Sequence, residues 1–359
     1  MHNTPTNMGK PLLTIAIPTF NRAQFLKVAL DQLCQELTRV EPGMIEVLIC
    51  DNASTDETSL VITRAAVQNH AIRAVRNIQN IGSDANIAQC FDLAMGHYVL
   101  VMGDDDILVD GAVEWILNRA QHKDYGVIGL RSYGFDFDFR AEHPGGSGRT
   151  TTYRTPGGLL VAIGPLITLI SSCVINKRLI ATTKAAEFCG SNLVQVHLVI
   201  RAALAGERSL YTSHYLVACK RNNSGGYAFF DVFVENLISI LNQYIGERLP
   251  RAAIRSFETR MLLGFYPFYA MRARRDKSTL PYVMRSRLSA RFGRRWLYRL
   301  WVDPITWLPR PMAIAWGALV TTIGRSITGD LRRGLAFAWN RVRRATPRPP
   351  RQEISLFRD

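Results

Sequence analysis

The sequence predicts an α/β fold, in which a mostly parallel central sheet is flanked by helices and followed by a helical, basic C-terminal region. Three observations predict it. In the first 125 residues, short apolar runs alternate with segments of helical periodicity, which is the pattern of strands joined by crossover helices. Polar clusters follow three of these apolar runs. Beyond Phe229 helical patterns dominate, and basic residues outnumber acidic ones.

Apolar runs rich in β-forming residues predict the strands, and apolar residues at helical spacing predict the helices. We expect buried strands over residues 12–18, 45–50 and 97–102, and a more exposed strand over 73–77. Helices are expected from Asn21, which can cap the first, from the Ser54-Thr55-Asp56 run, and over 84–95 and 110–120. The less regular middle predicts strands over 127–130 and 167–176, a Gly- and Pro-rich loop over 143–158, and a helix over 192–205.

Charge divides the chain unevenly. The formal net charge is +15, and from Arg251 onwards there are 23 Lys and Arg against 6 Asp and Glu. The first 250 residues are therefore close to neutral, with 21 basic and 23 acidic residues. A basic region can bind nucleic acid, anionic lipid or another acidic surface, but no nucleic-acid module signature is present, so we expect no nucleic-acid partner.

Other sequence features bear on the compartment. Six cysteines are scattered without a CxxC pair, which favours reduced thiols over disulfides or a metal site. The polar N-terminus does not resemble a secretory signal, and no apolar stretch reaches the roughly 18 residues of a membrane span.

The polar clusters that follow the predicted strands carry the chemistry. They are Pro18-Thr19-Phe20-Asn21-Arg22, Asp51-Asn52-Ala53-Ser54-Thr55-Asp56 and Gly103-Asp104-Asp105-Asp106. In an open parallel sheet, ligands bind beyond the carboxyl ends of the strands, so these residues are expected to gather on one rim. Each cluster alone could be an ordinary turn or cap, but three in succession favour a binding site.

The three consecutive aspartates indicate a divalent metal. A nucleotide diphosphate cannot approach them unless a cation lies between, and Mg²⁺ or Mn²⁺ takes one or two carboxylates together with phosphate oxygens and water. Asp51, at a strand end, can accept a hydrogen bond from a nucleotide base, and Arg22 is placed to meet phosphate. Asn80, Gly82 and Asn86 lie in a turn entering a helix, where Gly82 would permit close approach of the backbone to a ligand.

These motifs resemble the family-2 glycosyltransferases of the GT-A fold in order and in spacing, over about residues 12–120. The resemblance implies that Thr19 and Asp51 line a nucleotide pocket and that the aspartates form the metal-binding DXD-type motif. It also implies an inverting reaction, in which a base deprotonates an acceptor hydroxyl that displaces the nucleotide diphosphate. We therefore expect a nucleotide-sugar site that includes Pro18, Asn21, Asn52, Ser54 and the residues already named.

The sequence departs from the family pattern at the metal motif. The usual motif is Leu-Asp-x-Asp-Asp, whereas Gly103 stands here in place of the first aspartate. Asp105 is therefore the first choice for the metal ligand, with Asp104 compensating and Asp106 beside it. This Gly-Asp-Asp-Asp form resembles the abequosyltransferase-like subgroup of O-antigen assembly.

The second departure concerns the catalytic base. The segment that matches the family's base is Gly190 to His197, and it contains no carboxylate. His197 is the only group there that could accept a proton near neutral pH, although a lone His on a partly apolar helix is more often packed. Asp136 and Asp138 are competitors on an acceptor-side loop, and Arg221 precedes a loop that could close over the diphosphate.

The basic C-terminal region mixes Arg with Trp, Leu and Phe, notably over 285–301 and 331–342. Such helices suit the surface of an anionic membrane, while packing on the catalytic domain or dimerisation is the alternative. Lipid-linked acceptors, which the resemblance implies, favour the membrane. The expected location is cytoplasmic, on the inner face of the plasma membrane.

The predicted organisation is a flexible N-terminus (1–10), a catalytic domain (11–227) with a nucleotide-sugar half (11–125) and an acceptor half (126–227), a membrane-associating region (228–345) and a flexible tail (346–359). The predicted function is transfer of a sugar, with inversion, from a nucleotide sugar to a hydroxyl of a glycan acceptor. The acceptor is expected to be polyprenyl-linked, and the pathway to be cell-surface polysaccharide synthesis of the O-antigen type. Two alternatives stay open: a sugar-phosphate nucleotidyltransferase, although its Gly- and Lys-containing triphosphate loop is missing, and a catalytically degenerate nucleotide-sugar-binding protein.

Overall fold

The computed structural model describes residues 10–221, 229–276 and 280–330. They fall into two compact units. The first comprises residues 10–159 and 166–221, and the second comprises residues 160–165 with the described helices from residue 229 onwards. The predicted flexible ends, 1–10 and 346–359, lie outside the described residues apart from Lys10, and so does the segment 331–345.

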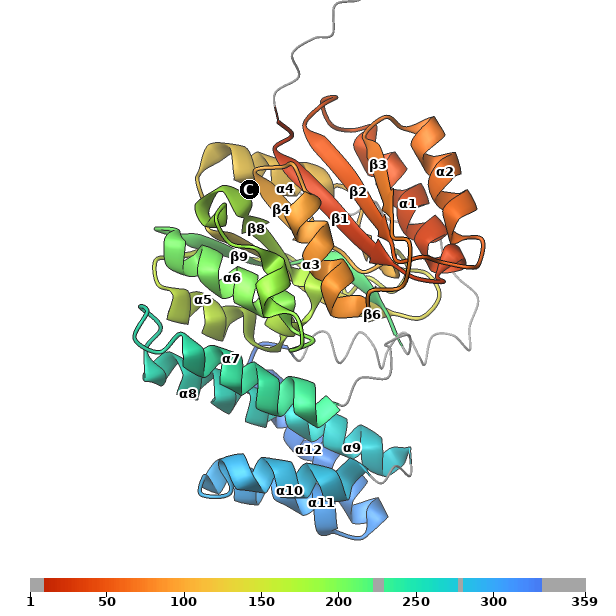
Figure 1. Ribbon diagram of the computed structural model, residues 1–359. Helices are drawn as coiled ribbons and strands as arrows, with labels where there is room; N and C mark the ends of the chain where they lie inside the picture. The colour runs from red at the N-terminus through yellow and green to blue at the C-terminus, as the bar shows by residue number, and fades with distance from the viewer. Residues whose placement is uncertain (1–9, 222–228, 277–279, 331–359) are drawn as a thin grey trace, which may run out of the picture. The chain divides into compact units, whose positions relative to one another are not determined.

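The first unit is built on a nine-stranded sheet (Figure 1). Its strands are β1 (Leu13–Thr19), β2 (Ile45–Asp51), β3 (Ile72–Arg76), β4 (Tyr98–Val101), β5 (Asp106–Leu108), β6 (Val127–Phe135), β7 (Thr150–Tyr153), β8 (Cys173–Asn176) and β9 (Ser209–Lys220). The strand order is β3-β2-β1-β4-β8-β6-β9-β5, and β7 pairs with β9. Strands β3, β2, β1 and β4 run parallel to their neighbours, β8 is antiparallel to β4 and β6, and β6 is parallel to β9.

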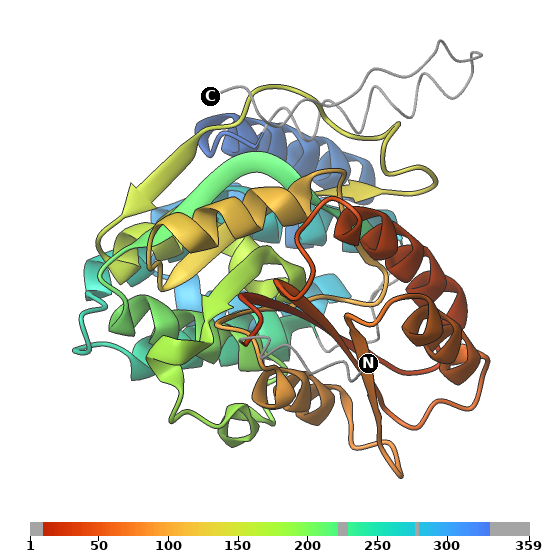
Figure 2. The same cartoon turned by 90° about the horizontal axis from the view of Figure 1, so that it is seen from above.

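Helices cover both faces of the sheet, as Figures 1 and 2 show together. One face carries α1 (Ala23–Leu37), α2 (Thr58–Gln68) and α4 (Ala112–His122), and the other carries α3 (Ser83–Leu93) and α6 (Val194–Ala205). Because the central strands are covered on both sides, every residue of β2 and β4 is buried. The predicted fold class, a mostly parallel sheet flanked by helices, is confirmed.

Three local predictions need correction. The 143–158 segment is not only a loop, because it contains β7 and the start of α5 (Pro156–Ile163). Only the last four residues of the expected 167–176 strand are extended, since 3-10 turns occupy Gly164–Thr168 and Ile170–Ser172. The third correction is an omission: β9 was not expected at all. Its partners β6 and β7 lie about 60–80 positions away in sequence, so local patterns carry little sign of it.

The second unit is helical, as expected. Beyond α5 it contains three π-helical segments, Asp231–Asn236, Met261–Phe265 and Tyr298–Val302. Its α-helices are α7 (Leu237–Gln243), α8 (Arg251–Arg260), α9 (Tyr266–Arg275), α10 (Leu280–Phe292), α11 (Asp303–Trp307) and α12 (Arg310–Ile327). Among the described residues, no helix combines the length and the apolar character needed to cross a bilayer.

Candidate active site

The carboxyl ends of the four parallel strands form one rim, and the three predicted polar clusters lie on it. Thr19 and Asp51 end β1 and β2 and are directly paired across the two strands. Asp104 follows β4, which is hydrogen-bonded to the other side of β1. The sheet therefore brings together residues that are 85 positions apart in sequence. This is the convergence that the sequence predicts.

A direct contact joins two of the clusters. The Thr19 hydroxyl donates to Asp104 Oδ2 at 2.8 Å. The guanidinium of Arg22 lies 3.6 Å from Asp104 Oδ1 and 3.8 Å from Asp105 Oδ2, so one cation faces two carboxylates. The side chain after β1 thus balances the charge of the residues after β4.

The three aspartates differ in accessibility. The Asp105 side chain is 18% exposed, against 9% for Asp104, and Asp106 is buried. Burial raises the pKa of Asp104 to about 6, although the Thr19 hydrogen bond and the Arg22 charge act in the opposite direction. Burial and then the nearby charge of Asp105 raise the pKa of Asp106 to about 7. Asp105 is therefore the carboxylate best placed to meet a ligand from solvent.

Asp106 faces the interior of the sheet. Its Oδ2 accepts a hydrogen bond from the Ser171 hydroxyl, and its residue pairs with Cys219 across β5 and β9. The same Ser171 oxygen accepts the Gly103 N–H at 3.0 Å. A Cβ on Gly103 would lie 3.1 Å from Asp106 Oδ2 and 3.2 Å from Asp105 Oδ1, so a larger residue there would crowd both carboxylates. Gly103 is part of how this shifted motif is packed.

The loops after β1 and β2 are tied together. The Asn21 N–H donates to Ser54 Oγ at 2.9 Å, and Asn21 Oδ1 accepts the Thr55 N–H at 2.7 Å. Asn21 does not cap α1 as expected, because its φ of 53° is left-handed and its side chain is turned to the other loop. Asp56, from the loop after β2, caps α1 instead by accepting the Ala23 N–H at 3.1 Å. It also accepts the Thr58 N–H at the start of α2.

Asp51 is buried and already has several protein partners. Its Oδ1 accepts the Ser54 N–H at 2.9 Å, and its Oδ2 lies 3.0 Å from Arg76 Nη1 and 3.1 Å from Ser59 Oγ. A nucleotide base that contacts this carboxylate would share it with these groups. Pro18, also predicted to line the site, is the residue of β1 that precedes Thr19 and is only partly buried.

The predicted turn residues form a second network on the rim. Asn52 Nδ2 donates to Asn80 Oδ1 at 2.8 Å and lies 3.3 Å from the Gly82 carbonyl. Asn86 Nδ2 donates to the Cys50 carbonyl at 2.9 Å, which fixes the first turn of α3 to the end of β2. Gly82 has a φ of 88°, the left-handed region that favours glycine. The structure therefore brings Asn52, Asn80, Gly82 and Asn86 together.

The acceptor-side candidates Asp136 and Arg221 contact one another. Arg221 Nη1 lies 2.9 Å from Asp136 Oδ2 and 3.2 Å from Glu142 Oε2. Glu142 is buried, and its carboxylate also accepts the backbone N–H groups of Asp136, Phe137 and Asp138. Residues 222–228, the loop predicted to close over the diphosphate, lie outside the described residues.

His197 is in a packed setting on α6. Its ring stacks on Phe188 with centroids 4.4 Å apart and planes 6° apart, and the residue is buried. Burial, assisted by the charge of Arg201, lowers the pKa of His197 to about 4. Buried histidines commonly pack in this way, as neutral rings stacked on an aromatic neighbour. This setting weakens the case for His197 as the catalytic base.

Several residues of the rim were not predicted. Ser171 and Cys219 pair with Asp106, and Glu142 binds the backbone of the loop that contains Asp136. Asp84 contacts the segment before α6. Only Asp84 carried a sequence signal, because it lies within the Asn80–Asn86 turn. The others come from segments whose contacts depend on β5, β8 and β9 coming together.

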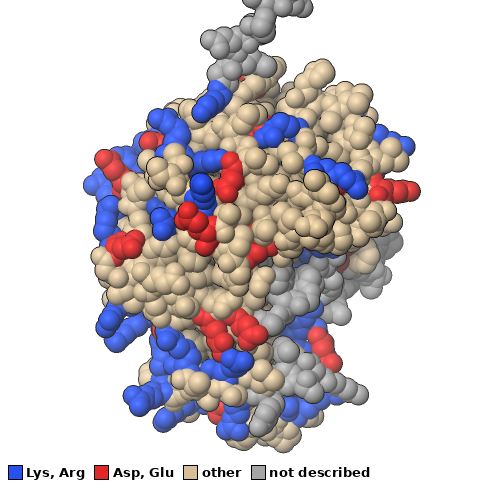
Figure 3. Space-filling model, in the orientation of Figure 1, with Lys and Arg blue, Asp and Glu red and all other residues tan. Residues whose placement is uncertain are grey.

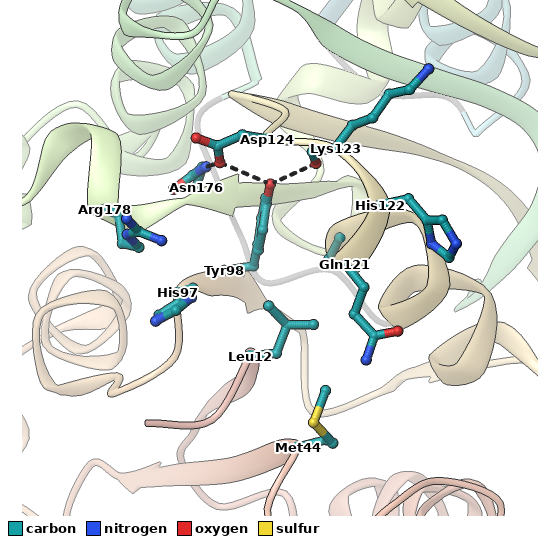
Figure 4. Close-up of a pocket in the computed structure, with 11 residues that line it drawn as sticks. Leu12, Met44, His97, Tyr98, Gln121, His122, Lys123, Asp124, Asn176 and Arg178 are labelled. Atoms are coloured by element: carbon teal, nitrogen blue, oxygen red, sulfur yellow. Dashed lines mark hydrogen bonds between the residues drawn. The ribbon is translucent and has the colours of Figure 1, made fainter. Parts of the chain in front are cut away.

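The cavity in Figure 4 lies at the other edge of the sheet. Its volume is about 530 Å³, and it is lined by residues that precede or begin β1, β2 and β4, such as Leu12, Met44 and Tyr98, together with the end of α4. Asn176, at the end of β8, contributes an Oδ1 that is buried without a hydrogen-bond partner among the described residues. None of the predicted site residues lines this cavity.

Known proteins resemble this chain in sequence and in fold. Residues 14–178 match the family described as Glycosyl transferase family 2. The chain is 37% identical to abequosyltransferase RfbV of Salmonella typhimurium over 99 residues, which is 27% of this chain and 29% of that protein. It is 29% identical to a GalNAc(5)-diNAcBac-PP-undecaprenol beta-1,3-glucosyltransferase of Campylobacter jejuni over 112 residues, or 31% of this chain and 35% of that protein. The matches to the curated relatives thus span well under half of their length.

Two solved structures share the fold over nearly the whole chain. S. aureus TarS 1–349 in complex with UDP-GlcNAc has a TM-score of 0.57 and 14% identity, with 92% of each chain covered. Mannosyltransferase PcManGT from Pyrobaculum calidifontis, in complex with GDP-Man and Mn²⁺, has a TM-score of 0.53 and 15% identity, covering 93% of this chain and 88% of that one. The sequence match and the fold agree: residues 14–178 are similar to family-2 glycosyltransferases, and the chain has the GT-A fold.

Proposed function

We propose that the protein transfers a sugar, with inversion, from a nucleotide sugar to a hydroxyl of a glycan acceptor in cell-surface polysaccharide synthesis. The observation that carries the proposal is the contact of Thr19 and Arg22 with Asp104 and Asp105. This contact joins the end of β1 and the loop after it to the acidic motif after β4. Both lie at the carboxyl ends of the strands, where ligands of such sheets bind. The TarS and PcManGT structures, which hold nucleotide sugars, support it.

Mn²⁺ or Mg²⁺ is part of this proposal, and the carboxylates of the rim fit such an ion. Among the described residues no three Asp, Glu, His or Cys side chains converge as a ready-made metal cage. These ions need only one or two carboxylates when phosphate and water complete the shell. Asp105, the most exposed of the three, would hold the ion, with Asp104 beside it and Asp106 supporting the motif from inside. A bound ion would neutralise the diphosphate as it leaves.

Arg22 gives a further reason for the fit. Its guanidinium faces Asp104 and Asp105, so the rim already accommodates positive charge between the acidic motif and the loop after β1. Arg22 and Thr19 then have different roles: Thr19 orients Asp104, and Arg22 is near enough to the motif to meet a phosphate oxygen. Asp51 and Asn52 hold the neighbouring loops, which shape the nucleotide pocket.

The acceptor that we propose is a glycan linked to a polyprenyl carrier, at the inner face of the plasma membrane. The Campylobacter relative is named for an undecaprenol-linked substrate. The C-terminal unit supports membrane contact through exposed Trp296 and Leu300, which are 70% and 62% exposed and one helical turn apart. Arg294 and Arg299 are exposed beside them, and such a mixture suits an anionic lipid surface. Figure 3 shows basic side chains over much of the visible face of this unit.

The function can be tested with a panel of nucleotide sugars that includes UDP-GlcNAc and GDP-mannose. We expect one of them to raise the melting temperature in the presence of Mn²⁺ or Mg²⁺, with little effect in excess chelator. The same donor should release its nucleotide diphosphate when a polyprenyl-diphosphate-linked sugar is supplied. Inverted configuration in the product would confirm the stereochemistry. Binding without turnover on any acceptor would instead favour a degenerate binding protein, because residues 190–197 lack a carboxylate.

A further inference from the structure

The segment that precedes α6 carries no carboxylate of its own, yet one is held against it. Asp84, in the first turn of α3, accepts the Gly190 N–H at 2.7 Å and the Asn192 N–H at 2.9 Å through the same oxygen, Oδ2. Gly190 and Asn192 both have left-handed backbones, with φ of 100° and 55°. The loop is thus shaped around the carboxylate of another element.

This carboxylate lies at the same edge of the sheet as the aspartate motif. Asn86 fixes the start of α3 to the end of β2. The far end of α6 lies at the start of β6, because a Cβ on Gly126 would meet the Ala202 carbonyl. Strand β6 runs in the direction of β4, since both are antiparallel to β8. The first turn of α6 therefore lies at the carboxyl edge of the sheet, which is also where Asp104 follows β4.

A chain of contacts connects the two groups more closely. Gln195, in the first turn of α6, donates to the Thr168 carbonyl at 2.8 Å. Three residues further on, Ser171 donates to Asp106 and accepts the Gly103 N–H. Only the short turn between Thr168 and Ser171 separates the first turn of α6 from the acidic motif.

Asp84 also suits a substrate hydroxyl better than the two predicted bases do. It is half-buried beside an exposed loop, and within the described residues its second oxygen, Oδ1, makes no hydrogen bond. His197, in contrast, is buried and stacked on Phe188, and Asp136 is engaged with Arg221.

We propose that Asp84 is the catalytic base, supplied by α3 in place of the carboxylate that residues 190–197 lack. The inference rests on the proposed glycosyl transfer. The acceptor hydroxyl gives its proton to Asp84 as its oxygen bonds to the anomeric carbon. The bond from that carbon to the diphosphate oxygen breaks, and its electron pair leaves with the nucleotide diphosphate. Asp84 Oδ2 stays held by the loop, which aims Oδ1 at the acceptor.

The test is Asp84→Asn, because an amide oxygen can still accept both N–H groups while it cannot take the proton. We expect release of nucleotide diphosphate to fall at least about 100-fold, the range of general-base catalysis. UDP or GDP, whichever the wild type binds, should still raise the melting temperature as in the wild type. In Asp84→Ala, added formate should restore part of the turnover, which a purely structural role would not allow.

Asp92 provides the matched control. It lies on the same helix and accepts the Ala185 N–H at 2.9 Å, so Asp92→Asn alters a similar clamp away from the acidic motif. Turnover of Asp92→Asn should stay within about threefold of the wild type. Near-normal turnover in Asp84→Asn, or loss of nucleotide binding together with turnover, would overturn the role of Asp84 and leave the transferase proposal intact. A wild type that turns over no donor would overturn both.

Discussion

The rim of the sheet and the C-terminal helices both concentrate charge, and they arrange it differently. At the rim, Asp104 and Asp106 are buried and held by Thr19 and Ser171. From residue 251 to 330 there are 15 Lys and Arg against 4 Asp and Glu. Acidic partners are shared there, as when Arg291 and Arg295 both contact Glu258.

The difference teaches what each region is suited to do. Charges that are fixed by buried partners are preorganised, which is the arrangement that favours chemistry on a charged substrate. A surplus of arginine beside exposed Trp and Leu favours attachment to an extended anionic surface instead. Substitutions in one region should therefore change turnover, and substitutions in the other should change location. The predictions below test this separation, beginning with the largest effect.

Asp105→Ala should lower donor turnover by about 1,000-fold, because metal stabilisation of the leaving diphosphate contributes several kcal/mol. The measurement is release of nucleotide diphosphate at saturating Mn²⁺. Binding to anionic vesicles should not change. Asp31→Ala, which alters an exposed pair with Lys27, is the control and should be nearly neutral. Full activity of Asp105→Ala would remove this residue from the metal site.

Glu142→Gln should destabilise the protein by about 2 kcal/mol, since a buried carboxylate loses charge-assisted hydrogen bonds to three backbone N–H groups and to Arg221. Denaturant unfolding would measure it. Glu235→Gln, at an exposed pair with Arg287 in the second unit, should have a much smaller effect. Equal losses would show that the two regions do not differ in how firmly their charges are held.

Trp296→Ser combined with Leu300→Ser should weaken binding to phosphatidylglycerol vesicles about tenfold, since two exposed apolar side chains no longer enter the interface. Donor turnover without vesicles should stay unchanged. Val67→Ser, at a 77% exposed site on α2, is the matched control in the first unit. If both variants partition like the wild type, the apolar part of the membrane proposal is wrong.

Asp106→Asn should give a pH-dependent stabilisation of the metal-free protein. Burial raises the folded-state pKa of Asp106 to about 7, from an ordinary value of 3.8. The folded state therefore binds more protons than the unfolded state between about pH 4 and pH 7, and stability falls as the pH rises through that window. The variant should match the wild type near pH 4 and exceed it in stability by a growing margin as the pH rises to about 7. Parallel stability curves would contradict this.

Much of the first unit follows from the sequence. Buried strands such as β1 and β2 and their neighbouring helices give strong local patterns, and the carboxyl ends of parallel strands must share an edge. This is why the meeting of Thr19 with Asp104 was predictable. The metal role of Asp105 and the nucleotide role of Asp51 stay predictions.

The remainder depends on contacts between distant segments. No local pattern indicates that Ser171 will meet Asp106, or that Asp84 will clamp Gly190, 106 residues away. Asn21 shows the same limit on a smaller scale: its residue type predicted a helix cap, but tertiary contacts turned its side chain to Thr55. Likewise, β9 gains its partners only when the whole sheet is assembled.

The hydrogen bonds of Asn21 with Ser54 and Thr55 have a consequence for engineering the choice of sugar donor. Because these hydrogen bonds join the loop after β1 to the loop after β2, a substitution at one of the bonded residues would disturb both loops at once. Libraries that seek a new donor should keep Asn21, Ser54 and Asp56 constant. Diversity belongs instead at exposed neighbours such as Phe20 and Ile81, where a new side chain can alter selectivity without loosening the frame.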